Sequence, residues 1–256
     1  YTKVAGSSAC VSCDPGKMAP ETSMPLCYDC MPGKHAPAPE SDICTLCSPG
    51  YFQNETKKMA CAECAPGRVA SISGMSECSQ CGMGQFQNLI GQTKCSECDV
   101  GKFADSTGSL SCFLCEAGTF SSRSGTVECP ACLPGKRSQA EGSVDCNDCE
   151  MGKYENSGSA SECVDCETGK SSLMGYVECL KCLPGKIAAT TASVECTSCK
   201  GGFYAGDEAS TSCKSCFPGM YSQSNAIACF NCAKGSFQPV QNSSSCQQCD
   251  LGLYQP

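Results

Sequence analysis

A four-residue unit, Cys-x-x-Cys, recurs fifteen times in this chain, and every other regularity of the sequence can be measured from it. Twelve of the fourteen steps between units are 17 residues long and two are 16. Such a strict period predicts an array of small structural repeats, running through residues 1–256 with no internal domain boundary. The first cysteines of the units are Cys10, Cys27, Cys44, Cys61, Cys78, Cys95, Cys112, Cys129, Cys146, Cys163, Cys179, Cys196, Cys213, Cys229 and Cys246.

The cysteine content indicates how such short units are held together. Each unit is far below the roughly 40 residues at which an apolar core begins to suffice without staples. The 30 cysteines among 256 residues place the chain with disulfide-dense proteins of oxidising compartments, so we expect an extracellular or cell-surface location. The chain starts and stops inside repeats, and we expect a fragment whose signal peptide and anchor lie outside it. No apolar run approaches the roughly 20 residues of a membrane span.

The charge balance disfavours several partners and activities. The 26 acidic and 18 basic residues give a formal net charge of -8, without long single-sign blocks, which argues against nucleic acids and anionic membranes as partners. A single histidine makes acid–base catalysis near neutral pH hard to build. We therefore expect no enzyme, no catalytic residue, no cofactor and no metal.

A glycine stands three residues after the second cysteine of every unit. Proline precedes this glycine in seven units, and Pro-Gly at the centre of a turn is typical of type II, in which glycine takes a positive φ. The pattern predicts a tight turn after each Cys-x-x-Cys. The glycines are Gly16, Gly33, Gly50, Gly67, Gly84, Gly101, Gly118, Gly135, Gly152, Gly169, Gly185, Gly202, Gly219, Gly235 and Gly252.

Two residues past the turn glycine, nine units carry an aromatic residue. We interpret this ring as a lid that packs over a neighbouring cystine rather than as part of a ligand site. His35 occupies the same position in its unit and is expected to be a surface substitute. The aromatic residues are Phe52, Phe86, Phe103, Phe120, Tyr154, Tyr204, Tyr221, Phe237 and Tyr254.

A second turn and a returning strand are expected before the next cysteine. Glycine lies four residues before that cysteine in Gly74, Gly91, Gly108, Gly125, Gly142 and Gly175. A β-prone apolar residue lies two residues before it in Leu110, Val127, Val144, Val177, Val194 and Ile227. Each unit is therefore predicted to be a small irregular hairpin, and no stretch has the period of a helix.

The period narrows the cysteine pairing without fixing it. An interlaced pattern would group units in twos, and the sequence has no such doubled period. Bridges within Cys-x-x-Cys are typical of redox enzymes, and the spacing is close to that of zinc ribbons, although four-thiolate sites would also group units in twos. We favour a sequential ladder: Cys13 with Cys27, Cys30 with Cys44, Cys47 with Cys61, Cys64 with Cys78, Cys81 with Cys95, Cys98 with Cys112, Cys115 with Cys129, Cys132 with Cys146, Cys149 with Cys163, Cys166 with Cys179, Cys182 with Cys196, Cys199 with Cys213, Cys216 with Cys229 and Cys232 with Cys246.

Two further patterns concern the surface. A repeat array aligns equivalent positions, so a basic and an acidic stripe are expected, which we interpret as solvated surface that could also support lateral contact. The sequons at Asn54 and Asn242 predict N-glycosylation. The lysines are Lys17, Lys34, Lys102, Lys136, Lys153, Lys170 and Lys186, and the acids are Glu77, Glu128, Asp145, Glu162, Glu178 and Glu195.

The unit from Cys95 through Gly101 and Phe103 to Cys112 has the pattern Cys-x-x-Cys-x-x-Gly-x-[Tyr/Phe]-x8-Cys. It resembles the cysteine-rich repeats called ephrin-receptor-like, and its loops are similar to the first loop of tumour-necrosis-factor-receptor modules. The resemblance covers residues 10–256 and implies that a disulfide closes the loop from the second cysteine of one unit to the first of the next. Long arrays of this kind are similar to segments of surface proteins of algae and other protists, including flagellar-hair (mastigoneme) proteins. Units without the aromatic residue, such as that of Ser171, depart from the pattern.

Together these patterns predict a small disulfide-rich fold, an elongated rod of fifteen stacked hairpin loops without helices. At about 10 Å per unit, the thickness of a packed sheet layer, the rod would span roughly 150 Å. We expect a secreted structural glycoprotein that forms a stalk or filament segment of a surface appendage, such as a flagellar hair, with other copies of itself or other surface proteins as partners. The alternatives are a ligand-binding receptor ectodomain and a zinc or redox protein.

Overall fold

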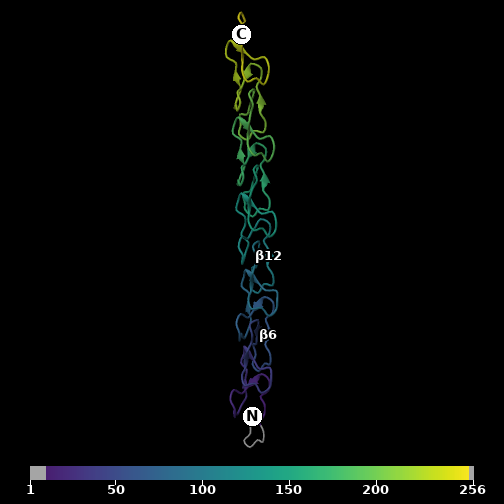
Figure 1. Cartoon of the computed structure of the whole chain (residues 1–256). Helices are drawn as coiled ribbons and strands as arrows, with labels where there is room; N and C mark the ends of the chain where they lie inside the picture. The colour runs from purple at the N-terminus through teal and green to yellow at the C-terminus, as the bar shows by residue number, and fades with distance from the viewer. Residues whose placement is uncertain (1–9, 254–256) are drawn as a thin grey trace. The chain divides into compact units, whose positions relative to one another are not determined.

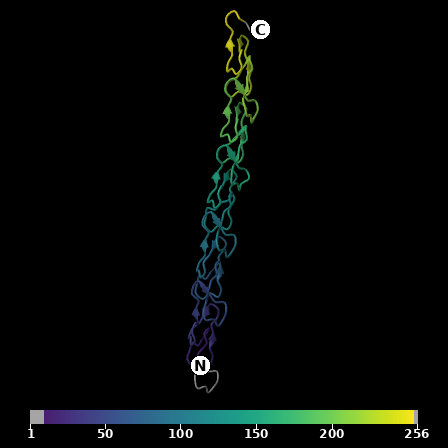
Figure 2. The same cartoon turned by 90° about the vertical axis from the view of Figure 1, so that its right-hand side faces the viewer.

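The computed structural model describes residues 10–253, which fall into two compact units. The first unit extends to Cys115 and includes Ser121–Cys129, and the second comprises Glu116–Phe120 and continues from Pro130. Both are built from very short antiparallel strand pairs, drawn as arrows in Figures 1 and 2, and none of the described residues is helical. The predicted disulfide-rich hairpin fold is confirmed.

Each strand is two residues long. The bounds are β1 Lys17–Met18, β2 Tyr28–Asp29, β3 Lys34–His35, β4 Thr45–Leu46, β5 Tyr51–Phe52, β6 Ala62–Glu63, β7 Arg68–Val69, β8 Ser79–Gln80, β9 Gln85–Phe86, β10 Ser96–Glu97, β11 Lys102–Phe103, β12 Phe113–Leu114, β13 Lys136–Arg137, β14 Asn147–Asp148, β15 Lys153–Tyr154, β16 Val164–Asp165, β17 Lys170–Ser171, β18 Leu180–Lys181, β19 Lys186–Ile187, β20 Thr197–Ser198, β21 Phe203–Tyr204, β22 Lys214–Ser215, β23 Met220–Tyr221, β24 Phe230–Asn231, β25 Ser236–Phe237 and β26 Gln247–Gln248.

The turn glycine opens each hairpin as predicted. Asp14, Pro15, Gly16 and Lys17 form the first turn, in which the Lys17 N–H donates to the Asp14 carbonyl at 3.2 Å. All fifteen turn glycines have φ between 76° and 88°, which is the value that the third residue of a type II turn requires. Glycine adopts this φ without the steric cost that a side chain would bring.

Each hairpin then pairs the two residues after the turn glycine with the two middle residues of the following Cys-x-x-Cys. Lys17 lies opposite Asp29 in the β1–β2 pair. In the 16-residue repeat that contains β17 and β18, Lys170 lies opposite Lys181, so the register is one residue shorter. Both turns of that loop keep their positive φ. The missing residue therefore comes from the stretch between the turns.

The loop closed by Cys115 and Cys129 has a single bridge in place of a strand pair. Here the Phe120 N–H donates to the Pro130 carbonyl at 3.0 Å, and Thr119 pairs with Ala131. Proline has no N–H to return the second hydrogen bond of the pair. The proline of Cys-Pro-Ala-Cys thus removes one hydrogen bond from the strand pair, and the loop keeps its disulfide.

The returning strand was predicted in the wrong place. The apolar residues two positions before the next cysteine, such as Leu110 and Val194, are exposed and lie outside every strand. The second strand instead lies inside the next Cys-x-x-Cys, because the disulfide brings that segment beside the turn glycine. The Cys30 N–H, for example, donates to the Gly16 carbonyl at 2.9 Å.

Cystines take the place that aliphatic side chains hold in a globular core. In the first unit Cys64, Ala70 and Cys78 form a buried cluster, with Phe52 and Met75 packed against it. Sulfur pairs and small side chains fill the space because loops this short cannot enclose larger ones. The rest of the surface that each loop buries must therefore be covered by neighbouring loops.

Candidate functional site

The junctions between loops are the candidate site, and the cystines form their centre. The structure has fourteen disulfides, and in each the Cα atoms are 5.6 to 5.8 Å apart and the cysteines are 14 residues apart in sequence, or 13 in the two shorter loops. They join the same pairs as the sequential ladder, from Cys13–Cys27 through to Cys232–Cys246. Cys10 and Cys249 lie outside these disulfides.

The two cysteines of a cystine are unequally covered. The second cysteine of each unit from Cys13 to Cys216 is at most 4% exposed. The first cysteine is half-buried in most units, but Cys78 and Cys146 are only 6% exposed. Solvent therefore reaches the ladder from the side of the first cysteine.

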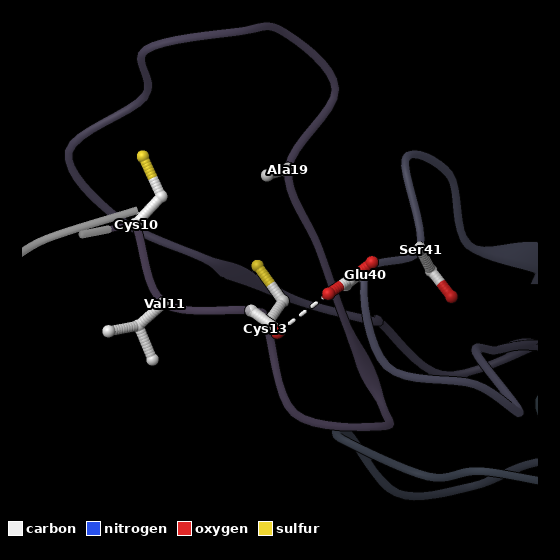
Figure 3. A pocket seen from close by; sticks show the side chains of 7 residues that line it. Cys10, Val11, Cys13, Ala19, Glu40 and Ser41 are labelled. Atoms are coloured by element: carbon white, nitrogen blue, oxygen red, sulfur yellow. Dashed lines mark hydrogen bonds between the residues drawn. The ribbon is translucent and has the colours of Figure 1, made fainter.

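A pocket of about 280 Å³ lies beside the first cystine (Figure 3). Its lining includes Cys10, Cys13 and Glu40, and the Ser12 hydroxyl donates to the Glu40 carboxylate at 2.8 Å. The Cys13 sulfur is bound to Cys27. The one carboxylate in the lining thus accepts from a serine, and the arrangement gives no reason to assign catalysis.

Backbone hydrogen bonds connect each loop to the next one. The Gly50 N–H donates to the Ala70 carbonyl at 2.8 Å, 20 residues farther along the chain. The Gly74 N–H donates back to the Cys47 carbonyl at 2.8 Å. Equivalent bonds recur along both units, and they satisfy backbone groups that loop stacking removes from water.

The turn glycine also meets the loop two repeats farther on. A Cβ built on Gly50 would lie closer than 3.0 Å to the carbonyl oxygen of Gly91, which real Cβ atoms do not do. Sequence reasoning assigned this glycine to its turn alone. The same close approach occurs at Gly16, Gly33, Gly50, Gly67, Gly84, Gly118, Gly135, Gly152, Gly169, Gly185 and Gly202.

The residue that supplies this carbonyl is the predicted second turn, and all fourteen closed loops place it at positive φ. Six loops use glycine there, and the other eight force a residue with a side chain into the left-handed region, which costs about 1–2 kcal/mol each. In six of these eight loops the residue packs against the turn glycine two loops back and its N–H donates to a cysteine carbonyl, and these contacts hold it in place. The eight are Ser23, Glu40, Lys57, Ser159, Ala192, Ala209, Asn225 and Asn242.

A buried position was missed by the sequence reasoning. It lies three residues after the turn glycine, and its only sequence signal is that it is always Ala, Ser, Gln or Glu. At three of the four serines the hydroxyl donates across the junction, as Ser172 Oγ does to the Lys153 carbonyl at 2.8 Å. The buried residues are Ala36, Gln53, Ala70, Gln87, Ala104, Ser121, Ser138, Glu155, Ser172, Ala188, Ala205, Ser222 and Gln238.

The aromatic position covers the cystine of the following loop. Phe52 packs against the cluster of Cys64 and Cys78, as the lid interpretation predicted. His35 is half-buried in the same place, with its Nδ1 3.2 Å from the Cys61 sulfur, so its prediction as a surface substitute was wrong. Tyr254 lies outside the described residues.

His35, Cys47 and Cys61 form the one group of potential metal ligands found among residues 10–253. Both cysteines belong to the same disulfide, so neither offers a thiolate. A cysteine binds a metal ion through its deprotonated sulfur, the thiolate. The arrangement therefore fits a capped cystine rather than a zinc site.

The lysine and acid stripes do not pair with each other. Lys136 lies 2.7 Å from Asp148, and Lys153 lies 3.3 Å from Asp165, each across its own strand pair. The hydrogen bond and charge of Asp148 raise the pKa of Lys136. Within the described chain, the acids that precede the first cysteines are exposed and form no ion pair. These acids are Glu77, Glu128, Asp145, Glu162, Glu178 and Glu195.

Glu155 is the one carboxylate at the buried position. The Ser157 hydroxyl and N–H both donate to it and lower its pKa. In three other loops glutamine fills this place and also donates to the carbonyl before the next cysteine, as Gln53 does to Ala60 at 2.7 Å. A carboxylate cannot make that second bond.

Glu155→Gln is therefore expected to remove the acid sensitivity of its loop. Because the folded pKa is lowered, the carboxylate stabilises the fold above its unfolded pKa of about 4.3, and this contribution is lost as the pH falls through the folded value. At pH 7 we expect the variant to stay within about 1 kcal/mol of the parent, since it gains one neutral bond and loses a charge-assisted one. Thermal unfolding between pH 7 and pH 3 measures the effect. Glu141→Gln, an exposed control, should leave the acid dependence unchanged.

Both predicted sequons are accessible. Asn54 and Asn242 are exposed, and the backbone of Asn242 also makes a junction contact, since its N–H donates to the Cys216 carbonyl at 3.1 Å. Its side chain is not used in that contact. A glycan on either residue would lie on the surface of its loop.

Comparison with known proteins identifies the repeat type. A family model described as tyrosine-protein kinase ephrin type A/B receptor-like matches residues 67–111, 101–149 and 219–256, and no curated protein matches the chain. Between residues 10 and 253 no helix has the length and hydrophobicity that a membrane crossing needs. The matched residues contain the turn glycines and cystine loops described above. Residues 67–149 and 219–256 are thus similar to the cysteine-rich repeats of the ephrin-receptor-like family.

Proposed function

We propose that this chain is an extracellular structural protein, a rod-like stalk or filament segment formed by one continuous array. The proposal rests mainly on how far along the chain the contacts between loops reach. Each loop is closed by its own disulfide, and in eleven of the fourteen loops the turn glycine contacts both the next loop and the next but one. Arrays in which repeats contact only near neighbours extend in one dimension.

The disulfide ladder should keep the chain in one piece after most proteolytic cuts. A cut inside a loop, for example after the exposed Lys57, leaves the two sides joined through Cys47 and Cys61. Only a cut between the two cysteines of a Cys-x-x-Cys would separate the chain, and that segment is a paired strand in most units. A stalk outside the cell benefits from both properties.

No enzymatic role is proposed. The single histidine, His35, lies with its Nδ1 3.2 Å from the Cys61 sulfur of a cystine, and this contact supports a packing role.

The cell-surface location, the glycans on Asn54 and Asn242 and the assembly with other copies of the chain or other surface proteins belong to the same proposal. Disulfides persist only in oxidising compartments, which supports a secreted protein. The exposed, unpaired acid stripe offers a repetitive surface for lateral contacts. A flagellar hair of the mastigoneme kind is the assembly that we propose.

A receptor ectodomain is the second candidate, and the family description favours it. A receptor would bind its ligand at a particular group of loops. The same backbone hydrogen bonds recur at the junctions along both units, and this regularity favours the structural role.

Two measurements test the proposal. For the oxidised, secreted chain, small-angle scattering should give a radius of gyration of about 40 Å, as for a rod of about 150 Å, against about 18 Å for a compact domain of this length. Antibody labelling of intact cells should mark a surface filament at regular intervals. A compact particle, or an isolated surface monomer with a soluble ligand, would overturn the proposal.

A further inference from the structure

The disulfides provide a covalent path that bypasses every loop. Each cystine spans 5.6 to 5.8 Å between Cα atoms while it closes a segment of 13 or 14 residue steps. The next cystine begins only three residue steps farther on, at the other end of the Cys-x-x-Cys. The shortest covalent route thus alternates between cystines and Cys-x-x-Cys segments.

We infer that tension on this chain runs along that route, so that the oxidised protein is a tether of fixed maximum length that a dithiol reductant lengthens in equal steps. The biological use of this reductant-dependent length rests on the proposed structural function. The length change itself depends only on the connectivity of the disulfides. The length change and the structural function can therefore be tested separately.

The expected lengths follow from chain geometry. A fully stretched Cys-x-x-Cys spans about 10–11 Å, so the route from Cys13 to Cys246 cannot exceed about 220 Å. When a disulfide opens, the segment that it closed can stretch to about 46–50 Å. Before reduction the two ends of that segment were 5.7 Å apart, measured between the Cα atoms of a cystine such as Cys149–Cys163, and this distance is subtracted. Each reduction therefore adds about 43 Å, and about 39 Å in the two shorter loops.

The release chemistry is thiol–disulfide exchange. A thiolate of the dithiol attacks the half-exposed sulfur of the first cysteine, the S–S bond breaks, and its electron pair leaves on the buried sulfur of the second cysteine. The second thiol of the reagent then displaces the mixed disulfide and closes to a cyclic disulfide. Protein disulfide and dithiol thus become protein dithiol and oxidised reagent.

Burial sets an order among the loops. In Cys64–Cys78 and Cys132–Cys146 both cysteines are at most 6% exposed, so the attacking thiolate reaches neither sulfur without local opening. In Cys98–Cys112, by contrast, Cys112 is half-buried. The two fully covered cystines are therefore expected to be reduced last.

Single-molecule stretching at constant force tests the tether. With handles attached beyond both ends, the oxidised chain should stop at its covalent limit, and a small dithiol should then produce discrete steps of about 43 Å. The Cys98→Ala/Cys112→Ala variant is the control: its oxidised limit should be longer by one step, and the dithiol should give one step fewer. Extension of the oxidised parent well past about 220 Å between Cys13 and Cys246, or steps of another size, would overturn the inference.

Partial reduction followed by alkylation and peptide mapping tests the order. Cys64, Cys78, Cys132 and Cys146 should be labelled at least about tenfold more slowly than Cys98 and Cys112, and equal rates would contradict the burial argument. If cell labelling found no surface filament while the length steps appeared, the proposed function would fail and the tether would stand.

Discussion

Gly152→Ala is expected to lower the free energy of unfolding of the second unit by about 2–5 kcal/mol. Part of this cost, about 1–2 kcal/mol, is the positive φ of 83°. The rest, about 1–3 kcal/mol, comes from the overlap of the new methyl group with the backbone carbonyl of Ala192. Hydrogen exchange should show lost protection at the Gly152 amide and at the Ala192 amide, which donates to the Cys166 carbonyl at 2.8 Å.

Gly219→Ala is the matched control. Gly219 has nearly the same φ, 79°, but among residues 10–253, its two chain neighbours aside, no atom lies within 4 Å of the position that a Cβ would take. This change should cost only the conformational part, about 1–2 kcal/mol. Equal effects of the two substitutions would show that the contact 40 residues along the chain contributes nothing.

Removing one cystine is the second large effect. Cys98→Ala/Cys112→Ala reopens a loop of about 15 residues and should cost that loop about 3 kcal/mol on the chain-entropy model. The loss should extend only to its neighbours, because Gly84 donates to Ala104 inside this loop and Gly108 donates back to Cys81. Amide exchange should therefore rise in the adjoining loops and stay unchanged around Cys199–Cys213. A uniform loss along the chain would contradict the local coupling.

A second double variant serves as its control. Cys95→Ala/Cys98→Ala removes the same number of cysteines but breaks two ladder disulfides, because their partners are Cys81 and Cys112. Thiol titration should detect the two abandoned partners in this variant and no new thiol in Cys98→Ala/Cys112→Ala. The opposite result would assign the bridges to other pairs.

The features that recur at a fixed spacing could be read from the sequence. The turn glycines and the second turn follow from the period, because each is a requirement of one loop. For the cysteine pairs, the period favoured the sequential ladder without fixing it. The lid role of Phe52 also followed, since an aromatic ring next to a cystine has few other ways to be buried. His35 was misjudged because its polarity was given more weight than its position.

The features that depend on packing between loops could not be read from the sequence. The close approach of Gly50 to Gly91 joins residues two repeats apart, and no single-repeat pattern reports it. The returning strand was assigned to residues such as Val194 from β-propensity alone, whereas the disulfide decides which segment lies beside the turn glycine. The buried position of Ala70 carries no large apolar residue, and its restriction to Ala, Ser, Gln or Glu was the signal that could have revealed it.

Tryptic cleavage without reduction tests the ladder most directly. Lys181 and Lys214 each lie between the two cysteines of a Cys-x-x-Cys, and no disulfide of the ladder spans either site. Digestion of the unfolded, oxidised chain at a pH that prevents disulfide exchange should therefore release residues 182–214 as a separate disulfide-linked fragment. If these residues stay attached to Cys179 or Cys216 until a reductant is added, the cysteines are interlaced or bridged within their own units, and the sequential ladder is wrong.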